Sequence, residues 1–377
     1  MYEYNKHYLA NYFERYPIAL EREYKQAHEL AYNQDTKRKQ NGYRTGSVMI
    51  QIINQPENVV EDTLSVLPAI YPKLKYKKET GIVYRTNLTK DCVPLLSGGG
   101  SGHEPAHFGY VGQGMLSCAV EGPIFVPPSA EHVLEGIKTV YNDKTGLLVI
   151  IKNFEADVTN FGSAIRQARE LGMNVEYVIS HDDISIESSS FMRRQRGVAG
   201  TVLMHKILGA AAQAKVELDN LVYMGNQISE CIATLGVASR AATLPGETDP
   251  MFELADHDIS YGIGIHGEEG YRTIGFESSE KLAVELVNKL NLKFHWHTHD
   301  PYIVLVNNLG GCTREEELIF THDILQLLEL EGLNIIDVKT GTYMTSLNMA
   351  GLSVTLFKLQ DPSWLAYYQA PTDAFAW

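Results

Sequence analysis

Long apolar runs are missing from this chain of 377 residues. No stretch of about 18 consecutive apolar residues occurs, so the sequence predicts no membrane-spanning helix. The N-terminus is polar and lacks the apolar core of a signal peptide. The four cysteines, Cys92, Cys118, Cys231 and Cys312, are far apart and form no CxxC pair, which argues against a disulfide framework and a zinc site. These absences together predict a cytoplasmic protein with reduced thiols.

Positive charge and nucleotide-binding motifs are also scarce. The 32 Lys and Arg against 46 Asp and Glu leave a net charge of −14, which argues against nucleic acid or an anionic membrane as a direct ligand. No Gly-Lys-Ser/Thr follows the glycine-rich stretch, so it is not a Walker loop, and it does not match GxGxxG. The composition, 44% hydrophobic and 21% charged, is that of a globular protein, and the length predicts two domains.

The first 48 residues differ from the rest of the chain by their many tyrosines. Apolar residues repeat with helical spacing between Leu9 and Tyr24, with an interruption near Pro17, and residues 34–42 are typical of an exposed linker. We expect residues 1–48 to be an N-terminal extension, helical or poorly ordered. Either it is an added interaction helix or it is a tail outside the folded domains, and the second interpretation is favoured.

From Met49 onward, predicted strands alternate with predicted helices. Apolar runs predict strands over residues 93–96, 124–128, 146–151 and 175–179, and helical patterns cover 160–171, 200–214 and 219–235. This alternation predicts a mostly parallel α/β sheet domain over residues 49–235. Strands at 302–306, 335–339 and 352–358, with helices at 280–290 (capped by Ser279) and 315–330, predict a smaller α+β domain over 236–377.

A glycine-rich stretch, Leu-Leu-Ser-Gly-Gly-Gly-Ser-Gly-His-Glu-Pro at 95–105, follows one of the predicted strands. Without Cβ atoms, its backbone N–H groups can approach a bound oxygen, so we expect a loop that binds a small oxygen-rich ligand. His103, at the end of this stretch, can donate to such a ligand or accept a proton from it. The alternative is an ordinary tight turn with a structural histidine.

Two further sets of polar residues follow predicted strands. Lys152 comes directly after the strand at 146–151, where a lysine can bind an oxygen ligand, and Asp157 can act as a general base. His266 lies between glycines and is followed by Glu268 and Glu269, which can orient it, and a neutral imidazole can attack a carbonyl carbon. The alternatives are a solvated lysine, a helix-capping aspartate and a histidine satisfied within a turn.

Alternating histidines at His295, His297 and His299 would lie on one face of a strand, an arrangement that can chelate zinc or nickel. No acidic or cysteine partner stands at a standard spacing. We therefore expect an exposed strand entering a loop, and no metal site.

With these residues identified, the chain from about Met49 to Trp377 resembles the DhaK family, the dihydroxyacetone-binding subunit or domain of dihydroxyacetone kinases. The resemblance rests on several blocks in one order. These blocks are residues 96–105, 109–116, 151–153, 196–201, 262–268 and 306–310. It implies two α/β domains in a homodimer. The first 48 residues have no counterpart in the family pattern.

The resemblance also implies a mechanism of ligand binding. His266 matches the histidine that holds the substrate carbonyl as a covalent hemiaminal, and His103 matches the histidine that hydrogen-bonds the substrate and assists catalysis. Asp157 matches the acceptor of the hydroxyl proton. The other substrate-binding positions implied are Gly100, Ser101, Gly102 and Lys152.

Members with a single chain carry a nucleotide domain after the substrate domain. This chain ends at Trp377 without room for such a domain, so the resemblance implies no cofactor on this chain and a separate DhaL-type partner that holds ADP or ATP with Mg²⁺, recharged by the phosphotransferase system. Some family positions differ here, notably Glu155, Glu269 and Asn348. The extra acids would repel a phosphoryl donor. That leaves a second interpretation, a non-catalytic DhaQ-like sensor that binds dihydroxyacetone and acts on a transcriptional regulator.

Overall fold

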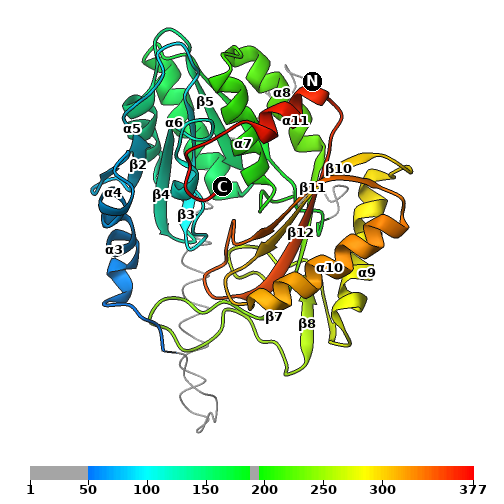
Figure 1. The fold of residues 1–377 in the computed structure, drawn as a ribbon. Helices are drawn as coiled ribbons and strands as arrows, with labels where there is room; N and C mark the ends of the chain where they lie inside the picture. Colours follow the sequence, from blue (N-terminus) through cyan, green and yellow to red (C-terminus); the bar gives the residue numbers. More distant parts are fainter. Residues whose placement is uncertain (1–49, 187–194) are drawn as a thin grey trace. The chain divides into compact units, whose positions relative to one another are not determined.

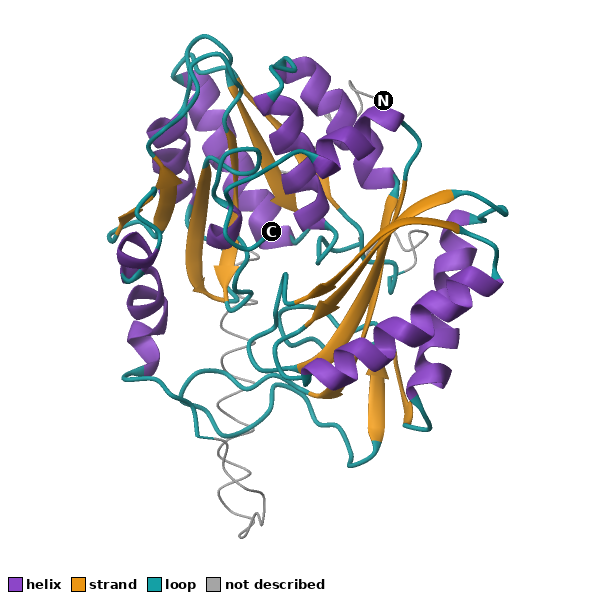
Figure 2. Ribbon diagram, viewed as in Figure 1, coloured by secondary structure: helices purple, strands orange, loops and turns teal. Residues whose placement is uncertain are grey.

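The computed structural model describes residues 50–186 and 195–377, and residues Gln51–Trp377 form one compact unit (Figure 1). The predicted N-terminal helix and linker lie outside the described residues. The compact unit contains two six-stranded sheets with helices packed against them, as the colouring by secondary structure in Figure 2 makes clear.

The first sheet is mostly parallel. Its strands are β1 (Leu74–Lys77), β2 (Ile82–Arg85), β3 (Leu95–Ser101), β4 (Cys118–Ile124), β5 (Leu147–Lys152) and β6 (Val175–Ser180). They lie in the order β1-β2-β4-β3-β5-β6. The strands β4, β3, β5 and β6 run parallel to one another, while at one edge β2 pairs antiparallel with β4 and β1 pairs antiparallel with β2. The predicted α/β class with a mostly parallel sheet is confirmed. Because the parallel strands share one direction, the residues that follow β3 and β5 meet at one edge of the sheet.

Helices cover both faces of this sheet. The helices α5 (Ala130–Val140) and α6 (Glu155–Glu170) pack together on one face, while α7 (Thr201–Gln213) and α8 (Leu218–Glu230) pack together against β5 and β6 on the other (Figure 1). Ser129 caps α5, because its side chain accepts a hydrogen bond from the His132 amide. Short helical segments precede the sheet or follow β3. These are η1 (Pro56–Asn58), α3 (Val59–Ser65), α4 (Leu67–Ile70) and η2 (Phe108–Tyr110).

The second sheet is mixed and has two helices on one face. Its strands are β7 (Ile232–Arg240), β8 (Asp258–Tyr261), β9 (Arg272–Gly275), β10 (Pro301–Asn308), β11 (Asn334–Gly341) and β12 (Ala350–Lys358), in the order β11-β10-β12-β7-β8-β9. Only β10 and β11 pair in parallel. The helices α9 (Ser279–Phe294) and α10 (Arg314–Leu330) pack on β7, β10 and β11. The last helix, α11 (Pro362–Gln369), returns to pack against α7.

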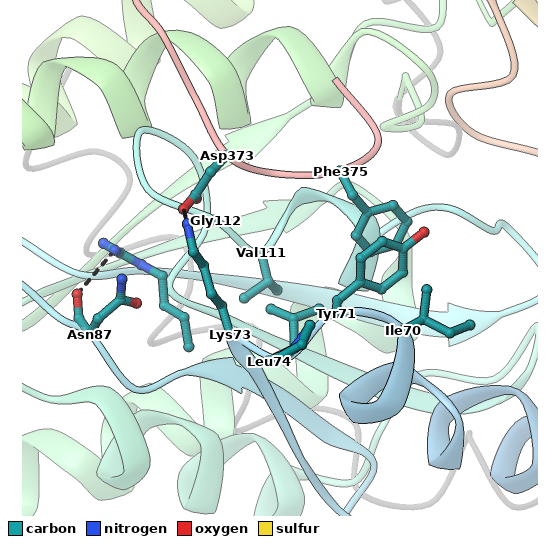
Figure 3. Close-up of a pocket in the computed structure, with 11 residues that line it drawn as sticks. Ile70, Tyr71, Lys73, Leu74, Asn87, Val111, Gly112, Asp373 and Phe375 are labelled. Carbon is teal, nitrogen blue, oxygen red and sulfur yellow. Dashed lines mark hydrogen bonds and ion pairs between the residues drawn. The ribbon is translucent and has the colours of Figure 1, made fainter.

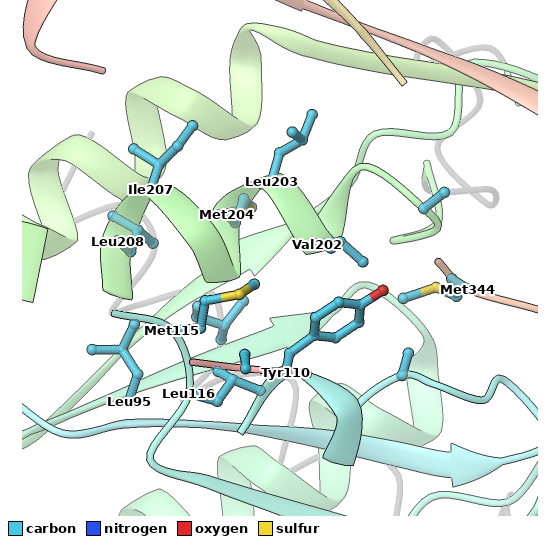
Figure 4. Packing of buried hydrophobic residues seen from close by; sticks show 14 of the residues in the cluster. Leu95, Tyr110, Met115, Leu116, Val202, Leu203, Met204, Ile207, Leu208 and Met344 are labelled. Atoms are coloured by element: carbon cyan, nitrogen blue, oxygen red, sulfur yellow. The ribbon is translucent and has the colours of Figure 1, made fainter. Parts of the chain in front are cut away.

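Both faces of the second sheet are covered by hydrophobic core, which explains the unbroken apolar run in β10. Val304 and Val306 face the cluster formed with α9 and α10, while Ile303 and Leu305 belong to the larger cluster shared with the first sheet. Figure 4 shows the centre of that larger cluster, where Tyr110 and Met115 pack against α7.

Several predicted boundaries are wrong. The strand placed at 124–128 is β4, which ends at Ile124, and the helix placed at 219–235 ends at Glu230, after which β7 begins. The boundary predicted between residues 235 and 236 falls inside β7, and the division into 49–235 and 236–377 stays a prediction. The cap of α9 is Ser278, not Ser279. Residues 295–299 form a loop after α9 and no strand, so alternation does not place their histidines on one face.

We expect Gly98→Ala to destabilise the fold. An added methyl group would overlap the carbonyl oxygen of Val120 in the neighbouring strand β4. Overpacking of this kind costs about 1–3 kcal/mol. Urea-induced unfolding measures the effect, and Gly275→Ala is the matched control, because nothing lies within 4 Å of a Cβ at that position. Equal changes for the two variants would contradict this account of β3.

Candidate functional site

The glycine-rich stretch is a strand and not the loop that we expected. Residues Leu95–Ser101 form β3, which pairs with β4 on one side and β5 on the other. The absence of side chains serves close packing there. Gly99 has a φ of +155°, and a Cβ at this position would lie 2.7 Å from Lys152 Nζ and 3.1 Å from Asp157 Oδ1. Gly99 therefore leaves space for two charged side chains next to the strand.

Lys152 and Asp157 are brought together at the carboxyl end of β5. Lys152 is the last residue of β5, and Asp157 lies in the first turn of α6. Their side chains are buried, and Lys152 Nζ and Asp157 Oδ1 have no hydrogen-bond partner among the described residues. Burial lowers the pKa of Lys152 and raises that of Asp157, while the charge of each opposes the shift of the other. Such atoms are available to a ligand that brings hydroxyl or carbonyl groups.

His103 lies two residues after the end of β3, and one hydrogen bond determines which of its ring nitrogens carries the proton. Its Nδ1 is 2.9 Å from the carbonyl oxygen of Thr345, which only accepts, so Nδ1 carries the hydrogen. Burial, followed by the positive charge of Lys152, holds the pKa of His103 well below its ordinary value. The neutral ring then presents Nε2 as an acceptor, and this buried atom has no hydrogen-bond partner within residues 50–186 and 195–377. His103 is thus suited to accept a hydrogen bond or a proton from a ligand hydroxyl.

His266 comes from the loop after β8 and meets His103, with 4.8 Å between the ring centroids. Its backbone N–H donates to Glu268 Oε2 at 2.8 Å, and Glu268 Oε1 lies 3.7 Å from His266 Nδ1. Arg196 lies 3.5 Å from Glu268 Oε1 and donates to Asp183 at 2.6 Å. Burial alone would raise the pKa of Glu268. The interaction of its carboxylate with the His266 side chain, together with the charges of His266 and Arg196, instead lowers this pKa to about 2. A carboxylate therefore faces Nδ1, which leaves Nε2 as the nitrogen for attack on a carbonyl.

Two of the groups predicted to contact a ligand from the glycine-rich stretch have hydrogen-bond partners within the protein. The hydroxyl of Ser101 donates to the Gly122 carbonyl at 2.7 Å, and the amide of Gly102 donates to Glu104 Oε1 at 2.9 Å. Both groups therefore already have partners within the protein. Gly100 packs against the backbone of Phe125. The substrate contacts implied for Gly100, Ser101 and Gly102 stay predictions.

Sequence reasoning missed the aromatic surroundings of His266. The ring of Phe154 lies 4.3 Å from the His266 ring, and Phe125 stacks 5.2 Å from His103 and lies 5.6 Å from His266, centroid to centroid. These rings place apolar surface against the two imidazoles. Phe154 follows Lys152 closely in the chain, so its place was a usable signal, whereas nothing in the sequence connects Phe125 with His266.

Among the described residues, no group of three or more His, Cys, Asp or Glu side chains is arranged to hold a metal ion. The described helices also include none that is long and apolar enough to cross a lipid bilayer.

These features define a two-sheet α/β protein whose candidate site brings His103, Lys152, Asp157 and His266 together. The chain belongs to the Dak1 domain family, whose model matches residues 66–376. It is 48% identical over 330 residues to the DhaKLM operon coactivator DhaQ of Lactococcus lactis, covering 87% of this chain and all of that protein. It is 43% identical to the dihydroxyacetone-binding subunit DhaK of a PTS-dependent dihydroxyacetone kinase of the same organism, covering 87% and 98%.

Solved structures agree with this assignment. A dihydroxyacetone kinase operon co-activator, Dha-DhaQ, matches with a TM-score of 0.81 at 47% identity, covering 86% of this chain and 99% of that one. The dihydroxyacetone kinase of C. freundii matches with a TM-score of 0.80 at 34% identity, covering 87% of this chain and 60% of the longer kinase chain. The family predicted from the sequence is confirmed, and it includes both co-activators and kinase subunits.

Proposed function

We propose that this chain binds dihydroxyacetone as a covalent hemiaminal on His266. The observation that carries the proposal is that three buried polar atoms have no hydrogen-bond partner among the described residues: His103 Nε2, Lys152 Nζ and Asp157 Oδ1. The ring of His103 lies 4.8 Å from that of His266, Lys152 Nζ lies 5.7 Å from the ring of Phe154, which itself contacts His266, and Asp157 Oδ1 lies beside Lys152 at Gly99. A ketone with two hydroxyl groups offers each of these atoms a partner. Unpartnered buried polar groups are costly, so such a ligand would stabilise the site.

The bond formation balances without a further reactant. Nε2 of His266 attacks the carbonyl carbon, and the electron pair of the C=O bond moves to the oxygen, which takes a proton and becomes a hydroxyl group. The proton that Nδ1 gives up balances the one that the oxygen gains, so the net change is addition of N–H across C=O, and the Glu268 carboxylate stabilises the positive charge on the ring during the attack. The ammonium of Lys152 can donate to the developing oxygen, and His103 Nε2 accepts from a ligand hydroxyl. Glycerol, which has no carbonyl, cannot form this bond.

The experiment that tests the proposal is ¹³C NMR of the protein with dihydroxyacetone labelled at the central carbon. We expect the bound carbon to resonate as a saturated carbon bonded to nitrogen and oxygen, and no longer as a ketone. Bound ligand that retains a ketone signal would contradict covalent binding.

The charge beside the site favours a sensor over a phosphoryl acceptor. Glu155 directly follows Phe154 at the start of α6, and Glu269 follows His266 by three residues, and both side chains are exposed. These carboxylates would repel an anionic phosphoryl donor. Our first candidate is therefore a DhaQ-like co-activator, in which the liganded chain acts on a transcriptional regulator.

The second candidate is the dihydroxyacetone-binding subunit of a phosphotransferase-dependent kinase. It is favoured by Asp157 Oδ1 and His103 Nε2, which are both placed to accept the proton of a ligand hydroxyl during phosphoryl transfer. In this role a DhaL-type subunit would hold the ADP and Mg²⁺, and the product would be dihydroxyacetone phosphate. A homodimer is predicted for both roles.

A phosphorylation assay separates the two roles. The chain is mixed with dihydroxyacetone, a DhaL-type subunit loaded with ADP and Mg²⁺, and its phosphoryl donor system, and dihydroxyacetone phosphate is measured. We expect bound ligand but no product, whereas the Lactococcus DhaK subunit, which is 43% identical, serves as the positive control. Product formation at the rate of that control would contradict the sensor role and establish the kinase role.

A further inference from the structure

A cavity of about 230 Å³ lies away from the candidate site, near the place where β2 ends and β4 begins (Figure 3). One of the residues that line it is Arg85, the last residue of β2. The Arg85 amide donates to the carbonyl oxygen of Ser117, which directly precedes β4. The candidate site, in contrast, follows the carboxyl ends of β3 and β5, which run parallel to β4. No residue that lines the cavity belongs to the candidate site.

The guanidinium of Arg85 is buried at this cavity, and a nearby charge compensates it only in part. Only 7% of the residue is exposed, and no ion pair joins it to another described residue. Nη1 donates to the carbonyl oxygen of Asn87 at 3.3 Å, and Nε has no hydrogen-bond partner among the described residues. Burial lowers the pKa of Arg85, and the nearby Asp373 only partly offsets this. Burial of an arginine in this state is unfavourable unless an anion binds next to it.

Asp373, the carboxylate whose charge acts on Arg85, already has other partners. Asp373 accepts from Lys73 Nζ at 2.7 Å and from the amide of Gln113. The cavity therefore contains two cations, Lys73 and Arg85, and one carboxylate that Lys73 neutralises. One positive charge remains, and it belongs to the buried Arg85.

The other end of the cavity is aromatic. The rings of Tyr71 and Phe375 stack with centroids 3.7 Å apart and planes inclined by 5°. Figure 3 shows these two rings at one end of the cavity, Asn87 at the opposite end, and Lys73 with Asp373 between them. A ligand that fits would carry an anionic group at the Arg85 end and an apolar portion at the ring end.

We propose that this cavity is a second ligand site, which binds a small organic anion through Arg85 and packs its carbon skeleton against Tyr71 and Phe375. Its volume is below the range of about 300–1,000 Å³ found for sites of drug-sized ligands, so the ligand is a small metabolite. A carboxylate and a phosphate monoester share the chemistry that a guanidinium recognises. The site is independent of the ligand proposed for His266, because the two share no residue.

Isothermal titration calorimetry of the full chain with phenyl phosphate, benzoate and inorganic phosphate tests the proposal. We expect phenyl phosphate or benzoate to bind, inorganic phosphate to bind more weakly because it lacks the apolar portion, and neutral phenol not to bind. Tighter binding of phenyl phosphate than of benzoate identifies a phosphate ester as the natural class, and the reverse identifies a carboxylate. Arg85→Gln should weaken binding at least about tenfold, because it removes the charge-assisted hydrogen bonds.

Lys90→Gln is the matched control, since it removes an exposed positive charge from the same segment without touching the cavity, and it should leave binding unchanged. If Arg85→Gln does not fold, Asn87→Asp serves instead, because it adds a carboxylate to the cavity lining at the residue whose carbonyl accepts from Arg85, and this negative charge should weaken binding of an anion. Failure of both organic anions to bind the wild-type chain would overturn the proposal. Unchanged binding in a folded Arg85→Gln or Asn87→Asp variant would overturn it as well. Because no cavity residue belongs to the candidate site, we expect covalent labelling of His266 to be unaffected in every case, so the two proposals fail separately.

Discussion

Replacement of His266 by alanine is expected to abolish the covalent adduct with dihydroxyacetone and to leave the fold intact. The imidazole is the only group proposed to form a bond to the ligand carbon, whereas Nε2 of the neighbouring His103 is assigned a ligand hydroxyl. His266 lies in a loop with 17% of its side chain exposed, so its removal creates no closed cavity in the core. The measurement is ¹³C NMR with ligand labelled at the central carbon, in which the signal of the saturated carbon should be absent.

His322→Ala is the control for this experiment. It removes an imidazole that is 64% exposed on α10 and does not touch the site, so the adduct should form as in the wild-type chain. Glu268→Gln separates orientation from bond formation. It removes the charge beside Nδ1, so the adduct should still form, but more slowly. If the His266→Ala chain retains the saturated-carbon signal, another nucleophile holds the ligand and the proposed role of His266 is wrong.

The sequence predicted which polar residues gather at the candidate site because they follow strands of one sheet or lie between glycines. Lys152 ends the clearest apolar run in the chain, and the parallel arrangement brings it next to the residues that follow β3. His266, from the second sheet region, could be joined to this group only through the family resemblance. No spacing in the sequence shows that it lies 4.8 Å from the ring of His103.

The local conformation of the glycine-rich stretch was mispredicted for a physical reason. Glycine runs are typical of turns, yet here β3 is held between β4 and β5, and its glycines let other groups approach closely. Tertiary pairing overrode the weak strand propensity of glycine. The same pairing places Gly99 opposite Glu121 of β4, a contact that no local pattern indicates.

Glu121 is a buried acid behind the site and leads to the second large expected effect. It is 4% exposed, its Oε1 accepts from the amide of His107 at 3.0 Å, and its Oε2 has no hydrogen-bond partner among the described residues. Burial raises the pKa of Glu121 to about 8 from its ordinary value of 4.5, with a smaller contribution from the charge of Glu104. At neutral pH the folded protein therefore holds a proton on Glu121 that the unfolded chain releases.

Glu121→Gln should stabilise the protein, increasingly so as the pH rises. Between the two pKa values the folded state binds more protons than the unfolded state, so the contribution of Glu121 to stability decreases as the pH rises through this window. Glutamine has the shape of the protonated acid and releases no proton. The difference in unfolding free energy between variant and wild type should grow from near zero at about pH 5 to about 3–5 kcal/mol at about pH 8.

Urea-induced unfolding at a series of pH values measures this difference. Glu79→Gln is the matched control, because Glu79 is exposed and its replacement should give no pH-dependent difference. A constant difference between the Glu121→Gln variant and the wild type would mean that Glu121 is ionised in the folded protein at neutral pH. The nearby charge of Lys152, which opposes the raised pKa of Glu121, would then be compensated by Glu121 as well as by Asp157. In that case Asp157 could take the proton of a ligand hydroxyl, because ionised Glu121 would still compensate the buried charge of Lys152. The pH series therefore also tests which carboxylate compensates Lys152.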